Sequence, residues 1–141
     1  MVNSGSLCLL MLTFGVCTNA QDALYPFGSA AGDTFMPHFY HNVTLLQSFH
    51  YFNRTYQNIY VFKFGFINMQ LHDAIYADII APFALVSERQ NVSYQQYTSG
   101  DVLHTATQDI NSYFPNVTFT ATWVFVATWD RVVFYLTNYV S

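Results

Sequence analysis

Apolar side chains occupy every second position over residues 117–127, and this alternation constrains the fold more than any other feature of the chain. The apolar positions are Val117, Phe119, Ala121, Trp123, Phe125 and Ala127. The intervening positions begin with Thr118, Thr120 and Thr122. A period of two is that of a pleated strand, and apolar groups on one face with threonine on the other are typical of a half-buried antiparallel strand.

Other segments repeat this pattern less regularly. Residues 58–67 alternate too, and we predict that their aromatic face packs into the core; this face carries Tyr60, Phe62, Phe64 and Phe66. Residues 75–86 are predicted to be a strand that Pro82 breaks or places at an edge. A further strand is expected over 131–136, after a turn or bulge at Trp129 and Asp130. Proline and glycine predict an irregular lead-in over residues 21–50.

One segment has a helical period instead. Over residues 101–114, a step of 100° per residue gathers six apolar side chains on one arc; these are Val102, Leu103, Ala106, Ile110, Tyr113 and Phe114. Asp101 is expected to be the N-cap, and Pro115 ends the helix. The predicted fold class is therefore α+β and β-rich, with antiparallel, sandwich-like sheets and one amphipathic helix packed on them.

The first twenty residues resemble a secretory leader. An apolar run of ten, Leu7–Val16, is followed by the small residues Thr18-Asn19-Ala20, and ten residues are too few to span a bilayer. We predict a signal peptide over 1–20, cleaved after Ala20, and a domain over 21–141 that inserts into no membrane. The alternatives are a retained anchor or a buried strand. Both cysteines, Cys8 and Cys17, lie inside the leader, so aromatic packing must replace disulfides in the exported chain.

Composition narrows the class of partner. The chain of 141 residues is 52% hydrophobic and 19% aromatic but only 9% charged, which excludes a disordered tail. Its four Lys and Arg residues face eight Asp and Glu residues, for a net charge of −4. No basic stripe is available to neutralise a phosphate backbone, so we expect protein or glycan partners and no nucleic acid.

Four N-glycosylation sequons support an exported protein, because glycans are added to secreted chains and mark their surface. The acceptor candidates are Asn42, Asn53, Asn91 and Asn116, each followed two residues later by Ser or Thr.

Residues able to perform chemistry are present without a recognisable catalytic pattern. The histidine candidates for a zinc site are His38, His41, His50 and His72 with its neighbour Asp73, but neither H-E-x-x-H nor C-x-x-C occurs. Two carboxylate pairs could converge for glycoside hydrolysis, Asp73 with Asp78 and Asp101 with Asp130. Asp33 and Asp130 are better explained as caps of backbone amides in turns. We therefore predict no catalytic residue, no metal and no cofactor, and a protein that is not an enzyme.

Several runs, in their order and spacing, resemble the NIDO domain of nidogen, alpha-tectorin and certain membrane mucins. They are Leu24–Gly28, Ala31–Asp33, Tyr51–Tyr56, Ile59–Val61, Gly65–Ile67, Ile80–Phe83, Tyr113–Pro115 and Trp123–Val132. The last run, with Ala127-Thr128-Trp129-Asp130-Arg131-Val132, is the most specific. The chain departs from the family at Ala84–Ser87, where acidic residues are usual, and at Phe62 and Phe64, where Asn is usual. The family continues for several further strands, so the domain over 21–141 is expected to be incomplete at its C-terminal end.

The resemblance implies a secreted, non-catalytic extracellular module. Such a module would act in cell–matrix adhesion and matrix assembly through contacts with extracellular matrix or cell-surface proteins. The alternative is a small secreted ligand-binding domain or hydrolase that uses an aromatic-lined pocket around Tyr60, Phe62 and Phe64.

Overall fold

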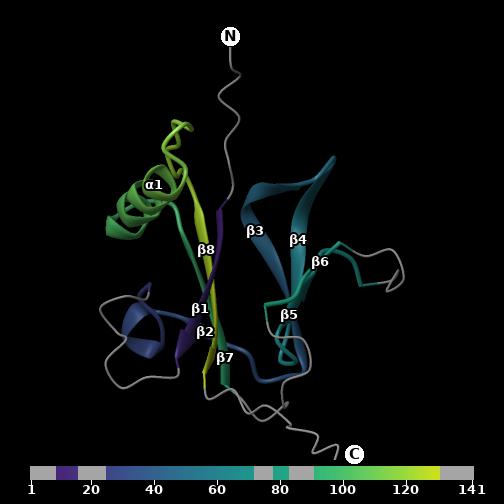
Figure 1. Cartoon of the computed structure of the whole chain (residues 1–141). Coiled ribbons are helices and arrows are strands. Elements are labelled where there is room, and N and C mark those ends of the chain that lie inside the picture. The colour runs from purple at the N-terminus through teal and green to yellow at the C-terminus, as the bar shows by residue number, and fades with distance from the viewer. Residues whose placement is uncertain (1–8, 16–24, 72–77, 83–90, 131–141) are drawn as a thin grey trace, which may run out of the picture.

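The computed structural model describes residues 9–15, 25–71, 78–82 and 91–130. Two four-stranded sheets face each other, and the helix α1 lies against the first sheet on the side away from the second (Figure 1). Within these residues, no helix is long and apolar enough to cross a membrane.

The strands of the second sheet follow one another along the chain, whereas those of the first sheet do not. The first sheet has the order β1-β8-β7-β2, with β1 Leu9–Gly15, β8 Val124–Asp130, β7 Asn91–Tyr97 and β2 Thr34–Phe35. The second has the order β3-β4-β5-β6, with β3 Tyr40–Tyr51, β4 Arg54–Phe62, β5 Phe66–Asn68 and β6 Ile79–Ile80. All pairs are antiparallel except β1 with β8, which is parallel. A short 3-10 turn, Ser29–Ala31, precedes β2, and α1 spans Asp101–Tyr113.

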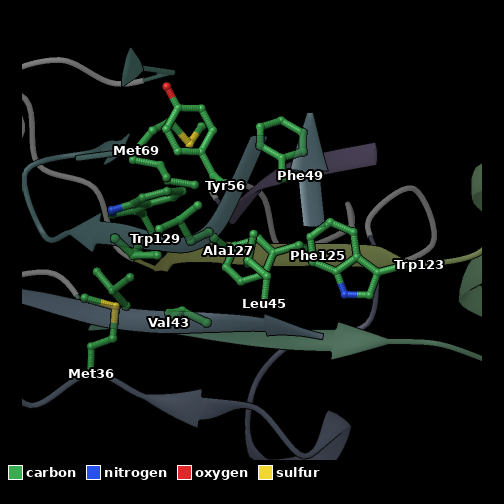
Figure 2. Close-up of a cluster of buried hydrophobic side chains, with 14 residues drawn as sticks. Met36, Val43, Leu45, Phe49, Tyr56, Met69, Trp123, Phe125, Ala127 and Trp129 are labelled. Carbon is green, nitrogen blue, oxygen red and sulfur yellow. The ribbon is translucent and has the colours of Figure 1, made fainter. Parts of the chain in front are cut away.

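The larger core fills the space between the sheets. Figure 2 shows Trp123, the residue before β8, in a row with Phe125, Ala127 and Trp129 of β8, facing side chains from the second sheet. Those partners include Val43, Leu45 and Phe49 from β3, Tyr56, Ile59 and Val61 from β4, and Ile67 from β5. The indole N–H of Trp129 donates to the carbonyl of Phe62 at 2.9 Å, which ties the two sheets together. The predicted sandwich-like fold with one packed helix is thus confirmed.

A second core lies between β8 and α1. It contains Val124 and Val126 of β8, Val102 and Ala106 of α1, and Phe119 and Ala121 of the connecting segment. Every residue from Val124 to Trp129 is consequently buried. The prediction that this strand is half-buried was wrong, because α1 covers the face of β8 that does not pack against the second sheet.

The alternating run at 117–127 is strand only from Val124 onward. Before it, the amide of Asn111 on α1 binds both backbone groups of Phe119: Nδ2 donates to the Phe119 carbonyl at 2.8 Å, and Oδ1 accepts from its N–H at 2.9 Å. The hydroxyl of Thr107 accepts from the Ala121 N–H at 3.0 Å. Helix side chains therefore take the place of a neighbouring strand, and the segment follows α1 instead of joining the sheet.

The single strand predicted over 58–67 is a hairpin. β4 ends at Phe62, residues 63–65 turn, and β5 begins at Phe66. Gly65 adopts φ +90°, a left-handed conformation that side chains disfavour, and its N–H bonds to the Phe62 carbonyl at 3.2 Å. Aromatic residues continue to occupy every second position across the turn, so the sequence pattern did not predict the turn.

Three other predictions need correction. The lead-in over 21–50 holds the long strand β3, because Val43 and Leu45 alternate with exposed neighbours. Trp129 and Asp130 form no turn, since they pair with Val92 and Asn91 within β8. Gly100, not Asp101, is the N-cap of α1.

The remaining predictions about elements are met only in part. The apolar arc of α1 buries Val102 and Ala106, whereas Tyr113 and Phe114 at its end are exposed. Of the residues predicted to form a strand over 75–86, the structure describes 78–82. Within them β6 spans Ile79–Ile80 and ends before Pro82. Residues 75–77, 83–86 and 131–136 lie outside the described residues.

The two hydrogen bonds between Asn111 and Phe119 predict a specific loss of stability. Asn111→Ala should lower the free energy of unfolding by about 2 kcal/mol, because half-buried backbone groups of Phe119 lose their partners. Ser112→Ala, at an exposed neighbouring helix position, should change it by no more than about 0.5 kcal/mol. Urea unfolding followed by tryptophan fluorescence measures both, and equal losses would contradict the role given to Asn111.

Candidate functional site

Two aromatic side chains of β4, Tyr60 and Phe62, lie on the outer surface of the second sheet. Ile59 and Val61 point into the core, so Tyr60 and Phe62 point the opposite way and are half-buried. The prediction that these aromatics pack in the core was wrong. The prediction that these aromatics share one face was correct, but the aliphatic residues of the same strand are the ones that face the first sheet.

These rings join those of neighbouring strands into one array, which we call the outer aromatic face; its members are Tyr40, Tyr60, Phe62 and Phe66. The centroid distances are 5.3 Å for Tyr40 and Phe62, 6.3 Å for Tyr40 and Tyr60, and 4.5 Å for Phe62 and Phe66. Tyr40 keeps 43% of its surface exposed. Exposed apolar patches on soluble domains commonly mark contact sites.

A surface hollow of about 520 Å³ lies beside Tyr60. Its described lining comes from β4 and the residues after β5, and includes Tyr56, Asn58, Met69 and Gln70. These residues supply amide, phenol and apolar groups. Such groups suit the binding of a neutral polar ligand better than acid–base catalysis.

A polar cluster borders the hollow. The hydroxyl of Tyr56 donates to Oδ2 of Asp78, and Arg54 Nη1 lies 3.8 Å from the same oxygen. Burial raises the pKa of Tyr56, the hydrogen bond to Asp78 raises it further, and Arg54 partly opposes this. No sequence pattern predicts this cluster, because β4 and the segment before β6 are brought together only by the fold.

Of the two carboxylate pairs considered for glycoside hydrolysis, the fold does not bring Asp101 and Asp130 together. Asp101 begins α1, just after the end of β7 that pairs with Val124, whereas Asp130 pairs with Asn91 at the other end of β8. Seven strand residues separate these ends by about 20 Å. Asp73 and His72 lie outside the described residues. Asp33 accepts from the Gly28 N–H at 2.9 Å and from Ser93 Oγ at 2.6 Å, as expected for an aspartate that caps a turn.

The described histidine candidates His38, His41 and His50 have separate surroundings. His41 packs against the ring of Tyr94 on β7 at 5.6 Å, His50 Nδ1 lies 2.9 Å from the Thr55 hydroxyl, and His38 is exposed. No group of three or more His, Cys, Asp or Glu that could hold a metal occurs among the residues the structure describes.

All four predicted glycosylation sites are exposed. Asn42 lies on β3, Asn53 in the turn between β3 and β4, Asn91 at the start of β7, and Asn116 after α1. Their modification stays a prediction. The predicted cleavage after Ala20 lies outside the described residues, although Leu9–Gly15 of the predicted leader forms β1.

Comparison with known proteins identifies the family. A family model described as the nidogen-like domain matches residues 45–139. The chain belongs to the nidogen-like (NIDO) domain family. Chicken (Gallus gallus) alpha-tectorin is 29% identical to it over 145 residues, covering 90% of this chain and 7% of that protein. Mouse (Mus musculus) nidogen-2 is 29% identical over 146 residues, covering 89% of this chain and 10% of that protein.

A shorter stretch of this nidogen-like domain is more similar to its relatives. Mouse alpha-tectorin is 44% identical over 48 residues, covering 33% of the chain and 2% of that protein. The nidogen-like domain thus spans at most about a tenth of the length of these relatives. No solved structure gives a significant match.

The pKa of Tyr56 predicts how stability changes with pH. Its folded-state pKa is raised, so its contribution is intact below about pH 10 and is lost as pH rises through the folded value. Tyr56→Phe should cost about 1–2 kcal/mol at pH 8, and this deficit relative to wild type should shrink at pH 11. Urea unfolding at both pH values measures the deficit. Tyr113→Phe, at an exposed position, is the control at pH 8; a deficit for Tyr56→Phe that does not change with pH would contradict this assignment.

Proposed function

We propose that this nidogen-like domain is a secreted, non-catalytic extracellular module that contributes to cell–matrix adhesion and matrix assembly through protein contacts. Residues 1–20 act as its signal peptide, cleaved after Ala20, and its sequons carry glycans. Its partners are extracellular matrix or cell-surface proteins. Membership of the family supports this role, since the relatives that it matches are alpha-tectorin and nidogen-2.

The proposal draws its strongest structural support from the edge of β8. All seven residues of β8 pair in parallel with β1, from Leu9 with Val124 to Gly15 with Asp130. Because β1 lies within the proposed signal peptide, cleavage would leave these seven backbone positions of β8 without a strand. β8 is buried on both faces, so the vacated edge would be a narrow apolar slot.

An added strand from another protein would fit this slot. A parallel strand needs no hairpin connection, and strand addition to an exposed edge is a common mode of peptide recognition. Main-chain hydrogen bonds would supply affinity, and the two cores beside β8 would favour apolar side chains. We propose that the occupant is an extended apolar segment of a matrix protein, aligned as β1 is aligned.

The hollow beside Tyr60 supports one alternative, a small secreted ligand-binding domain. In that case a neutral polar ligand should bind between Tyr60 and Gln70, and Tyr60→Ala should abolish binding. Screening simple sugars by tyrosine fluorescence, with Tyr60→Ala as the control, would separate this alternative from strand addition at β8, which lies in the other sheet.

Export can be tested directly. The full chain, expressed in secretory animal cells, should appear in the medium with Gln21 as its first residue. Treatment with an amidase that removes N-glycans should lower its mass in steps, one for each occupied sequon. Retention of the chain inside the cell with residues 1–20 still attached would contradict export.

Strand addition predicts that the chain 21–141 binds its own leader peptide. A peptide of Leu9–Gly15 flanked by lysines should raise the free energy of unfolding by about 2–3 kcal/mol at 100 times its dissociation constant. The same peptide with Leu12→Pro should fail, because proline cannot donate a main-chain hydrogen bond. Equal effects of both peptides would contradict pairing at this edge.

A further inference from the structure

Strand β3 places one sequon directly beside the outer aromatic face. In the register of β3 and β4, Asn42 lies opposite Tyr60, and Tyr40 lies opposite Phe62. Residues two apart on a strand share a face, so Asn42 points to the same side as Tyr40. His41, which contacts the ring of Tyr94, and the core residue Val43 flank Asn42 and lie on the opposite face.

The usual spacing of paired strands places a sugar on Asn42 within reach of these rings. Directly opposed side chains in an antiparallel pair have Cβ atoms about 4.5–5.5 Å apart, and diagonal neighbours lie within reach of aromatic side chains. One face of a pyranose ring carries mainly C–H groups, which pack on aromatic rings. Tyr40 and Tyr60 therefore form a ready surface for the first sugars of a glycan, at the edge strand of the sheet.

The other sequons have different surroundings. Asn91 also lies on a strand, but its partner across the pair is the carboxylate Asp130. Asn53 lies in the turn between Tyr51 and Arg54, and Asn116 follows α1, so neither belongs to a described strand pair. Among the four sequons, Asn42 thus differs in having an aromatic residue, Tyr60, directly opposite it on the paired strand.

We propose that the N-glycan on Asn42 packs its first sugars against Tyr40 and Tyr60 and covers the outer aromatic face. The glycan then stabilises the fold and keeps this face from other proteins, which leaves protein contacts to the first sheet. This inference rests on the proposed export, because glycans are attached only in the secretory pathway.

A double-mutant cycle tests the contact. The four proteins are wild type, Asn42→Gln, Tyr60→Thr and the double variant, all secreted from the same cells and unfolded in urea. Asn42→Gln should raise the unfolding equilibrium constant about fivefold when Tyr60 is present and have little effect when it is Thr. Binding of a fluorescent apolar dye should increase in Asn42→Gln.

Matched controls separate the contact from a general effect of glycans. Asn91→Gln removes a glycan from another strand, and its effect should add to that of Tyr60→Thr without coupling. An endoglycosidase that leaves one sugar on Asn42 should preserve the coupling. If Tyr60→Thr does not fold, Tyr40→Thr at the more exposed ring replaces it.

The outcomes distinguish this inference from the proposed export. A secreted chain with other sequons occupied and Asn42 bare, as measured by glycopeptide mass spectrometry, would overturn the inference alone. Occupied Asn42 with additive effects in the cycle would also overturn it. A chain retained inside the cell with residues 1–20 attached and all four sequons bare would overturn export and the inference together.

Discussion

Strand β8 is held between two cores, and the arrangement of every other layer depends on this. Its odd-numbered residues Phe125, Ala127 and Trp129 pack against the second sheet, while Val124 and Val126 pack against α1. Burial of apolar surface is the main favourable term in folding, so a strand that loses water from both faces sets the positions of its neighbours. The Trp129 indole bond to the Phe62 carbonyl then fixes the distance between the sheets.

Polar side chains complete this arrangement where strands end. Asn111 and Thr107 hold the segment that leads into β8, and they do so with hydrogen bonds that a strand would otherwise provide. Gln96 on β7 does the same across the sandwich: its Oε1 accepts from the Leu46 N–H at 2.9 Å, and its Nε2 donates to the Thr44 carbonyl at 3.0 Å. Buried or edge backbone groups need such partners, and an exposed strand edge is otherwise prone to pair with other chains.

The two sheets offer different surfaces for recognition. In the proposed exported form, removal of β1 from the first sheet would expose the edge of β8, where main-chain groups and flanking cores would favour an extended apolar strand. The second sheet presents aromatic rings beside a sequon, where the proposed glycan on Asn42 would cover them. A division of this kind would direct protein contacts to one side of the module and keep the other side soluble, in a chain with 9% charged residues.

Local sequence determined the class of the fold, the helix over 101–113 and the family, because the period of apolar residues and the order of motifs are properties of neighbouring residues. It could not decide which face of 58–67 is buried, since aromatic and aliphatic residues alternate there and both suit a core; contact with β8 selected Ile59 and Val61. The turn at Gly65 and the diversion of Phe119 by Asn111 were hidden for a related reason: alternation continues through both, and only distant partners end the strand. The cluster of Tyr56 with Asp78 and the pairing of Asn42 with Tyr60 came from the fold alone, because contacts between separate strands depend on register, which the tertiary structure sets.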